Sequence, residues 1–403
     1  MSVLDGVLVV EAATLLAGPM AGGLLGDFGA RVIKVELPGR GDPLRDHAPF
    51  DQGISLYSKV TNRNKESMTL DLHDERDRAV LRHLLDRADV FITNFRPSTL
   101  EAWGLAYEAL EPANPRLVML QVSGFGSSGP YRDKPGFARI AEAFAGLTYI
   151  TGYPDTPPTF SGYPVADGLG AVYGAFGILL ALLERERSGR GQLVDLPLYA
   201  PILRMMEHLV IGFRELGLVP ERQGSLNPVV APNNIYRSRD GVWVILPAST
   251  QTMFERLAHA IGRPDWVDDP RFATNRGRLE QRTELEREIA TWIADRGFAE
   301  VAAQLTAYDV AWMKVNTIAD LCEDPHVVAR GDIIDVPDAE LGRRLAMQGV
   351  VPRLSRTPGT VHRAGPALGE HQEILLREFT GRDHAQAHPP LSSATSPDGE
   401  APE

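Results

Sequence analysis

Short β-branched runs alternate with helical patterns along the first part of the chain. Residues 7–11 (VLVVE) form an apolar run that predicts a buried strand, and small and apolar residues recur at helical spacing from Gly18 to Gly29. Residues 31–37 (RVIKVEL) predict a second strand, and Pro38 to Asp42 break the chain after it. A strand–helix–strand order is typical of a parallel sheet, so we expect the α/β fold class.

The alternation continues to about residue 122. Three more strands are predicted at residues 67–72, 89–93 and 117–122, and two helices at residues 75–88 and 98–105. A second region follows residue 222. Its residues 238–248 predict a hairpin on Asp240-Gly241, and helical patterns follow at residues 251–261, 279–296 and 298–307. We therefore expect a large domain in two parts (1–222 and 325–386), a smaller α+β domain (227–324) and a disordered tail (387–403).

The longest apolar run, Leu169 to Leu183, follows closely after Asp167. The run is shorter than the ~20 residues that span a bilayer, so it predicts a buried helix. Asp167 would then stand at the positive end of that helix, where a carboxylate stays ionised. Such a carboxylate is either a helix cap or a nucleophile, and the pattern alone leaves both interpretations open.

The composition is that of an ordinary globular protein, with 43% hydrophobic and 23% charged residues. The net charge of -12 argues against a sequence-independent nucleic-acid binder, although a local basic pocket can still hold an anion. Cys322 is the single cysteine, which excludes an internal disulfide and fits a reducing cytosol. The N-terminus lacks the basic start of a signal peptide. We expect a cytoplasmic protein with no nucleic-acid or membrane partner.

Several loops carry residues that could hold a ligand. Gly18-Pro19 with Gly22-Gly23 could approach a phosphate, but the spacing is not GxGxxG and glycines at a strand–helix junction are often packing devices. Asn94 to Pro97 follows a strand, where it could grip an adenine–phosphate ligand or form a turn with Pro97 in the first helical position. Residues 123–131 (SGFGSSGPY) contain no GxSxG elbow, and the ten histidines form no HExxH set, so no metal site is expected.

Long motifs occur in a fixed order along about Leu4 to Phe379: AGP (17–19), GDFGARVIKVELPGRGDPLR (26–45), NRNKESMTLDL (62–72), ADVFITNFRP (88–97), NPRLVMLQVSGFGSSGPY (114–131), AD (166–167), SGRGQLVD (188–195), DPRFATNRGR (269–278), DPHVVARG (324–331) and TPG with GPALGEH (357–371). Together they make the chain similar to the family III CoA-transferases, the group of carnitine–CoA and formyl-CoA transferases. The resemblance implies a Rossmann-like large domain, a smaller α+β domain and a homodimer of two interlocked rings.

The resemblance also implies that Asp167 is catalytic. It would attack the thioester carbonyl of a donor acyl-CoA, giving an aspartyl mixed anhydride and the CoA thiolate, and exchange with an acceptor carboxylate would then yield a new acyl-CoA without a metal. Backbone N–H groups near Gly168 would stabilise the oxyanion. The residues that the resemblance implies for CoA binding are Leu16, Ala17, Leu37, Leu70, Asp71, Leu72, His73, Asn94, Phe95, Arg96, Lys134, Pro135, Gly136 and Phe137.

The chain departs from the family pattern in two places. Many relatives carry an acidic residue at the position of Ala138, and Glu142, one helical turn later, either replaces it or is a solvated surface residue. Many transferases also have a Gly-rich loop that shields the anhydride, whereas the matching residues 247–251 (PASTQ) lack glycine. In addition, Leu37 stands where some relatives carry a cation.

Alternative functions of the same fold can be distinguished by the catalytic side chains that each requires. A 2-methylacyl-CoA racemase needs a second acid–base group at the position of Phe137, and a phenyl ring carries no proton. An isomerase that moves CoA within one molecule would keep Asp167, whereas a non-enzymatic CoA-binding protein would not need it. Residues 136–152 resemble members that use succinyl-CoA and C4 or C5 dicarboxylates. Arg139, Arg214 or Arg222 would then pair with a distal carboxylate, or form surface salt bridges instead.

Overall fold

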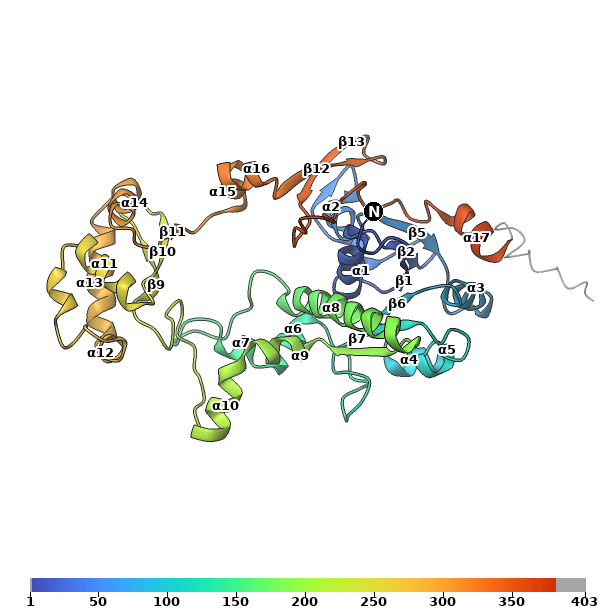
Figure 1. Cartoon of the computed structure of the whole chain (residues 1–403), viewed down its shortest axis with the longest axis horizontal. Helices are drawn as coiled ribbons and strands as arrows, with labels where there is room; N and C mark the ends of the chain where they lie inside the picture. Colours follow the sequence, from blue (N-terminus) through green and yellow to red (C-terminus); the bar gives the residue numbers. More distant parts are fainter. Residues whose placement is uncertain (1, 382–403) are drawn as a thin grey trace, which may run out of the picture. The chain divides into compact units, whose positions relative to one another are not determined.

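The computed structural model describes residues 2–381, so the predicted tail at 387–403 lies outside the described residues. The chain divides into two compact units (Figure 1). Within the described residues, unit 1 comprises residues 2–145, 163–207 and 331–381, and unit 2 comprises Gly146–Gly162 and His208–Arg330. The domain boundaries expected from the sequence stay a prediction.

Unit 1 is built on a six-stranded sheet in the order β5-β2-β1-β6-β7-β8, in which every neighbouring pair is parallel. Counted along the chain, these strands follow the order 3-2-1-4-5-6 of doubly wound nucleotide-binding folds, so the Rossmann-like prediction is confirmed. The direction of winding reverses between β1 and β6. The strands are β1 (Leu8–Ala12), β2 (Arg31–Glu36), β5 (Lys65–Thr69), β6 (Val90–Thr93), β7 (Val118–Ser123) and β8 (Leu193–Pro197).

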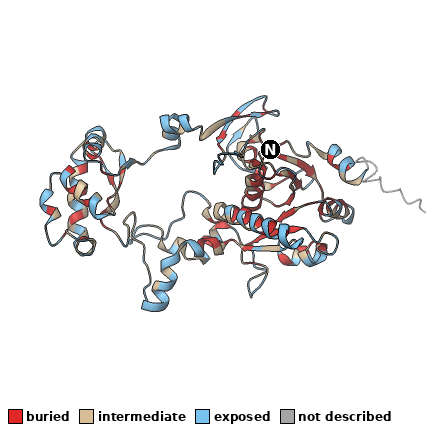
Figure 2. Cartoon of the chain, viewed as in Figure 1, coloured by how far each residue is buried: buried red, intermediate tan, exposed pale blue. Residues whose placement is uncertain are grey.

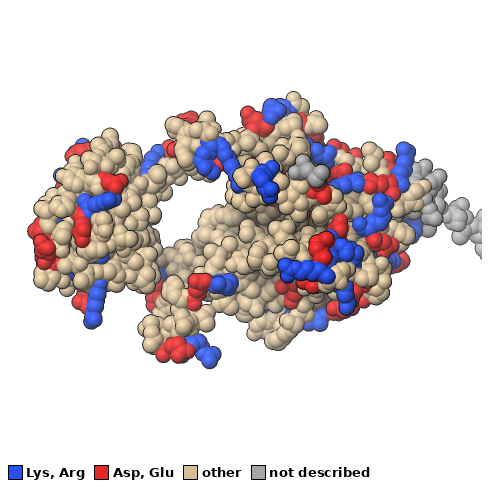
Figure 3. Space-filling model, in the orientation of Figure 1, with Lys and Arg blue, Asp and Glu red and all other residues tan. Residues whose placement is uncertain are grey.

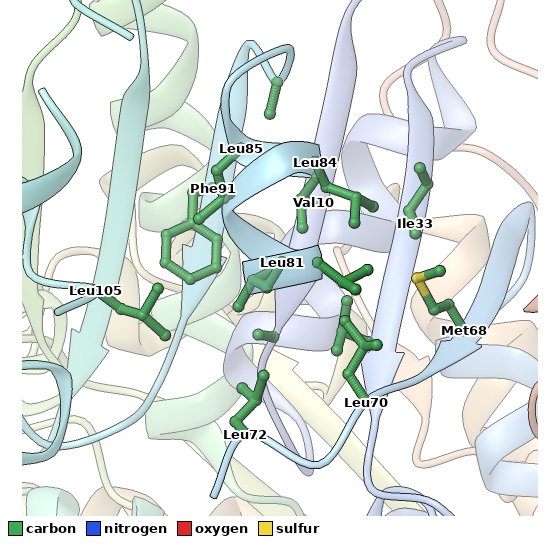
Figure 4. Close-up of a cluster of buried hydrophobic side chains, with 14 of the residues drawn as sticks. Val10, Ile33, Met68, Leu70, Leu72, Leu81, Leu84, Leu85, Phe91 and Leu105 are labelled. Atoms are coloured by element: carbon green, nitrogen blue, oxygen red, sulfur yellow. The ribbon is translucent and has the colours of Figure 1, made fainter. Parts of the chain in front are cut away.

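Helices cover both faces of this sheet. On one face, Leu81 and Leu84 of α3 pack with Val10, Ile33 and Phe91 of the strands in a fully buried apolar cluster (Figure 4). The helices of unit 1 are α1 (Ala17–Asp27), α2 (Leu56–Thr61), α3 (Glu75–Leu85), α4 (Pro97–Trp103), α5 (Tyr107–Leu110), α6 (Ala138–Phe144), α8 (Val165–Ser188), α9 (Tyr199–Met205) and α17 (Gln372–Thr380), with a 3-10 turn η1 at Pro43–Asp46. Two small hairpins pair β3 (Phe50–Asp51) with β4 (Ile54–Ser55) and β12 (Ile333–Asp338) with β13 (Arg343–Gln348).

Helix α8 packs on the other face of the sheet through its small residues. A Cβ atom added at Gly170, Gly174 or Gly177 would come within 2.8 Å of Leu198, within 2.8 Å of Leu120 or within 2.7 Å of Val194, respectively. These glycines therefore let the helix backbone approach the strands closely. Among the described helices, α8 alone is long and apolar enough to cross a membrane, but a core helix packed on a sheet passes the same test.

Several large apolar residues of α8 are exposed, so the prediction of a buried helix is only half right. Figure 2 shows that α8 carries both buried and exposed positions. Val172, Phe176, Leu179, Leu180 and Leu183 are each at least 42% exposed. Hydrophobicity alone did not show which face turns inward, because the inward face is made mostly of glycine and alanine, with Ile178 and Leu182 among them. We call these five residues the α8 stripe.

Beside β1, charged side chains are fully buried in the sheet. Lys34 Nζ lies 2.9 Å from Glu11 Oε1 and 2.8 Å from Asp42 Oδ2, and Lys65 Nζ lies 2.8 Å from Glu11 Oε2. Burial lowers the pKa of Lys65 to about 8, despite the opposing charge of Glu11. Burial also opposes the charge on Lys34, but Glu11 and Asp42 outweigh it and raise the pKa of Lys34. Pairing of this kind is what makes buried charges tolerable.

Unit 2 has a three-stranded antiparallel sheet, β11-β10-β9, covered by helices around a core that includes Phe254, Trp266 and Phe272. The predicted hairpin is confirmed, since β9 and β10 pair across the turn at Asp240-Gly241. Its elements are α7 (Leu147–Ile150), α10 (Glu207–Leu216), β9 (Asn233–Arg237), β10 (Trp243–Pro247), α11 (Gln251–Ala260), η2 (Pro264–Val267), α12 (Asn275–Glu280), α13 (Arg282–Ala294), α14 (Phe298–Ala307), β11 (Met313–Lys314), α15 (Ile318–Glu323) and α16 (Pro325–Arg330).

Two glycines of α1 provide a matched test of the buried charges. A Cβ at Gly22 would lie 2.2 Å from Glu11 Oε2, whereas a Cβ at Gly26 would meet Val32 at an ordinary 3.4 Å. We expect Gly22→Ala to lower the free energy of unfolding by about 2 kcal/mol, because Glu11 must leave its two lysines. Gly26→Ala should be neutral or stabilising by up to about 1 kcal/mol, because alanine favours the helix. Urea unfolding of both variants checks this, and equal destabilisation would contradict it.

Candidate active site

A cavity of about 290 Å³ opens in unit 1 at the carboxyl ends of β1, β6 and β7. This position includes the point where the strand order reverses, which is where doubly wound sheets bind their ligands. Asp167 reaches the cavity from the first turn of α8. The cavity is lined by Thr14, Leu15, Leu16, Ala17, Asn94, Arg96, Val122, Ser123, Gly124, Arg132, Lys134, Pro135, Gly136, Phe137, Ala138, Arg139, Asp167 and Leu198.

A second cavity of about 210 Å³ lies beyond the ends of β1, β2 and β5 and shares Thr14 with the first. Its wall is mostly apolar, with the aromatic rings of Phe95 and Trp103 in edge-to-face contact at 5.1 Å between centroids. It is lined by Ala12, Ala13, Thr14, Val35, Glu36, Leu37, Arg40, Gly41, Asp42, Pro43, Leu70, Leu72, His73, Phe95 and Trp103.

The structure brings the residues predicted to bind CoA together in these two places. All of them line one of the two cavities except Asp71. The Asp71 carboxylate instead accepts hydrogen bonds from the backbone N–H of His73, at 3.0 Å, and lies 2.9 Å from its Nδ1. Asp71 therefore orders the turn after β5 and lies outside the lining of both cavities, and its assignment as a ligand contact stays a prediction. The role of the other residues stays a prediction.

Asp167 does not cap α8. The residue before the helix is Pro164, which forms no side-chain cap, and Asp167 is the third helical residue. Burial and, secondly, the negative charge of Glu142 raise the pKa of Asp167 from 3.8 to about 6, and Arg139 opposes them. Desolvation and a like charge thus outweigh the helix dipole, but with a pKa of about 6 the carboxyl is still mostly ionised at pH 7.

Glu142 on α6 is buried, at 1% exposure, so it is not a solvated helix residue. Its Oε1 accepts a hydrogen bond from the backbone N–H of Ala166 at 3.3 Å, and its Oε2 accepts one from Arg139 Nη1 at 2.7 Å. The Arg139–Glu142 pair thus ties α6 to the first turn of α8 beside Asp167. Whether Glu142 replaces the acidic residue missing at Ala138 stays a prediction.

Two tyrosines near Asp167 were not found from the sequence. Burial, followed by Tyr163 and Asp167, raises the pKa of Tyr57, so its hydroxyl keeps its proton. The Tyr163 ring lies against the start of α8, since a Cβ at Gly168 would meet it at 3.2 Å. The Gly168 N–H donates to the Pro164 carbonyl at 3.2 Å, so this particular group is engaged in the helix and is not a ready oxyanion donor.

The loop after β1 is held in an unusual conformation at the edge of the first cavity. Leu15 has a φ of 65°, a left-handed value that costs a non-glycine residue roughly 1 kcal/mol or more. Its N–H donates to Asp42 Oδ1 at 2.9 Å, and Asn94 Oδ1 accepts from the N–H of Thr14 at 3.0 Å while its Nδ2 donates to the Thr14 carbonyl at 2.8 Å. Asn94 is therefore a brace for the cavity wall, a role that its position after β6 did not reveal.

Two cations in the cavities are not used by the rest of the fold. Over residues 2–381, the guanidinium groups of Arg40 and Arg96 form no ion pair or hydrogen bond with other side chains. Elsewhere, acidic and basic side chains are interspersed over the visible face of the molecule (Figure 3). Lys134 lies over the Tyr131 ring at 3.5 Å. Unpaired arginines beside a pocket suit a phosphate-bearing ligand. Within the same residues, no cluster of metal-binding side chains occurs.

The chain is similar to CoA-transferases over nearly its whole length. It is 45% identical over 379 residues, 94% of each chain, to succinyl-CoA–D-citramalate CoA-transferase of Chloroflexus aurantiacus. It is 41% identical, again over 94% of each chain, to the beta subunit of succinyl-CoA–L-malate CoA-transferase of the same organism. The crystal structure of a CAIB/BAIF family protein from Brucella suis superposes with a TM-score of 0.82 at 32% identity, covering 94% of this chain and 99% of that one.

Residues 4–372 match CoA-transferase family III. The order of the strands, the cavity at the reversal of the sheet and the similarity along the whole chain agree with one another. The chain belongs to the family III CoA-transferases and is an enzyme that transfers CoA between an acyl-CoA and a carboxylic acid.

Proposed function

We propose that this enzyme moves CoA from succinyl-CoA to a dicarboxylic acid and that Asp167 carries the acyl group. The observation that supports this most directly is the position of Asp167, which lines the cavity and accepts no hydrogen bond from any other described residue. Relatives that use succinyl-CoA with D-citramalate or L-malate support the substrate class.

The chemistry uses Asp167 twice. Its ionised oxygen attacks the thioester carbonyl of the donor, a C–O bond forms and the C–S bond breaks, which gives an anhydride and the CoA thiolate. The thiolate then attacks the aspartyl carbonyl, releases the donor acid and leaves an aspartyl–CoA thioester. The acceptor carboxylate then attacks this aspartyl–CoA thioester, which releases the CoA thiolate and forms a second anhydride. The thiolate attacks the acceptor's carbonyl in that anhydride, which yields the new acyl-CoA and free Asp167. Protons balance without an external acid or base.

The two cavities would divide the CoA substrate between them. The apolar and aromatic wall made by Leu37, Phe95 and Trp103 suits the adenine ring. Arg40 in that cavity and Arg96 in the neighbouring one would pair with the phosphate groups, so a cation is supplied even though Leu37 itself has none. The pantetheine arm would then pass Thr14 and reach Asp167.

We also propose that the enzyme is a homodimer. The α8 stripe exposes five large apolar side chains in a row on one helix, and such a surface is covered in water by another protein surface. A second copy of the chain would cover it, and the interlocked arrangement is implied by the family resemblance. A cytoplasmic location is proposed because Cys322 is a free thiol.

Asp167→Ala should abolish CoA exchange between succinyl-CoA and carboxylic acids, with a loss of about 10⁴-fold or more, because no other group can form the anhydride. Acyl-CoA products from a panel of acids are followed by mass spectrometry. Hydroxylamine should trap the wild-type intermediate as a hydroxamate on Asp167, and Glu207→Gln, at an exposed site, should react normally. Exchange retained by the alanine variant would contradict the proposal. Deuterium uptake at the α-carbon without CoA exchange would favour a racemase. Transfer of CoA only between two carboxyl groups of the same molecule would favour an isomerase.

Asp167 should be held in the folded protein at a cost in stability. The pKa of its carboxyl is raised to about 6, so at pH 7 the folded state carries a charge that it disfavours. Asp167→Asn should therefore raise the free energy of unfolding by about 2 kcal/mol at pH 7. The gain should shrink as the pH falls and vanish below 3.8, where the carboxyl is neutral in both states. Unfolding curves at several pH values check this, and a loss of stability at pH 7 would contradict it.

The acid limb of the pH profile should report the ionisation of Asp167. Because the attacking form is the carboxylate, kcat/KM should fall about tenfold per pH unit below about 6. Glu142→Gln removes the neighbouring negative charge, so the pH below which kcat/KM falls should become lower by about 0.5 to 1 unit. Glu207→Gln, whose carboxylate lies on the surface, is the matched control. If kcat/KM of the Glu142 variant began to fall at the same pH as in the wild type, a group other than Asp167 would control the pH profile.

A further inference from the structure

The first cavity is lined by four cationic side chains, and one of them, Arg139, lowers the pKa of Asp167. Arg96, Arg132, Lys134 and Arg139 all line the cavity. The charge of Arg139 favours the ionised form of Asp167. Arg132 pairs with Glu101 and Lys134 lies over the Tyr131 ring. Among the four, Arg139 therefore combines a place in the cavity wall with a favourable charge for Asp167.

Arg139 is also held firmly in place. Its Nη1 donates to the buried Glu142 at 2.7 Å and lies 3.4 Å from the Tyr163 carbonyl, while 35% of its side-chain surface stays exposed. Glu142 is in turn fixed by the backbone N–H of Ala166, in the helical turn that carries Asp167. Hydrogen bonds through Glu142 thus connect the guanidinium group of Arg139 to the helical turn that carries Asp167.

In a C4 or C5 diacid, the distal carboxylate lies about 4–5 Å from the carbonyl carbon that Asp167 would attack. We infer that Arg139, oriented by Glu142, binds this distal carboxylate and makes the enzyme selective for dicarboxylic acyl groups. The inference rests on the proposed CoA transfer through Asp167. Once Asp167 is acylated it has lost its negative charge, so it no longer repels a substrate carboxylate.

The test compares two acceptors of nearly equal size that differ in the distal group. Isotope-labelled succinate and its monoamide, succinamate, are each incubated with succinyl-CoA, and the rates of labelled succinyl-CoA and succinamyl-CoA formation are measured. The wild type should prefer succinate by about 100-fold in kcat/KM, since a charge-assisted hydrogen bond is lost with the amide. Arg139→Met should reduce this preference to about fivefold or less, and Arg139→Lys should restore part of it.

Two further variants separate recognition from folding. Arg139→Met leaves Glu142 buried without its partner, so the double variant Arg139→Met/Glu142→Gln removes both charges and should show the same loss of preference in a folded protein, verified by its melting curve. Arg132→Met, in the same cavity wall, should keep the preference for succinate. If the double variant formed succinyl-CoA and succinamyl-CoA more slowly by the same factor, its preference would be unchanged. That result would overturn the role of Arg139 without affecting the proposed function. Wild-type enzyme that forms neither product nor trapped acyl-Asp167 would overturn the proposed function and, with it, this inference.

Discussion

The pairing of buried charges beside β1 is the constraint on which the architecture of the site depends. Glu11 lies between Lys34 and Lys65, and Lys34 also holds Asp42. Asp42 then accepts the N–H of Leu15, the residue whose left-handed backbone forms the rim of the cavity. A buried charge that loses its partner is strongly destabilising, so each of these groups fixes the others. The loop that carries Leu15 is consequently attached to this buried charge cluster.

A similar arrangement on a smaller scale surrounds Asp167. Burial and Glu142 disfavour its charge, and Arg139 partly restores it, so the pKa of the carboxyl lies near 6 and the group is mostly ionised at neutral pH. A carboxylate with a higher pKa is a better nucleophile than a fully solvated one, and it is also a poorer leaving group. The exchange proposed for this enzyme uses Asp167 in both roles. An intermediate basicity suits it, because neither the attack nor the departure then becomes prohibitively slow.

The sequence predicted the sheet well and its surroundings less well. The β-branched runs at residues 7–11 and 31–37 predicted strands because their periodicity is local, and the motifs identified the family. The orientation of α8 was missed, because hydrophobicity ranks Leu183 above Gly174 and does not reveal that small residues allow the closest packing. Regularly spaced glycine and alanine residues were the available signal.

The electrostatics of the site could not be predicted from local patterns. Glu142 and Asp167 are far apart in the sequence, and only the packing of α6 against α8 places them together. Position alone suggested that Asp167 stays ionised but did not reveal its raised pKa, and it left Glu142 undecided between a surface residue and a partner. The brace formed by Asn94 and the tyrosines at positions 57 and 163 were missed for the same reason, since each acts on a segment distant along the chain.

The path of a single oxygen atom tests the central claim most directly. When the enzyme turns over succinyl-CoA with an acceptor whose carboxylate is labelled with ¹⁸O, the bridging oxygen of the second anhydride comes from the acceptor and stays on the enzyme. Mass spectrometry of the peptide that contains Asp167 should then show ¹⁸O in that side chain. Product formation with an unlabelled Asp167 would contradict the covalent role assigned to this carboxylate.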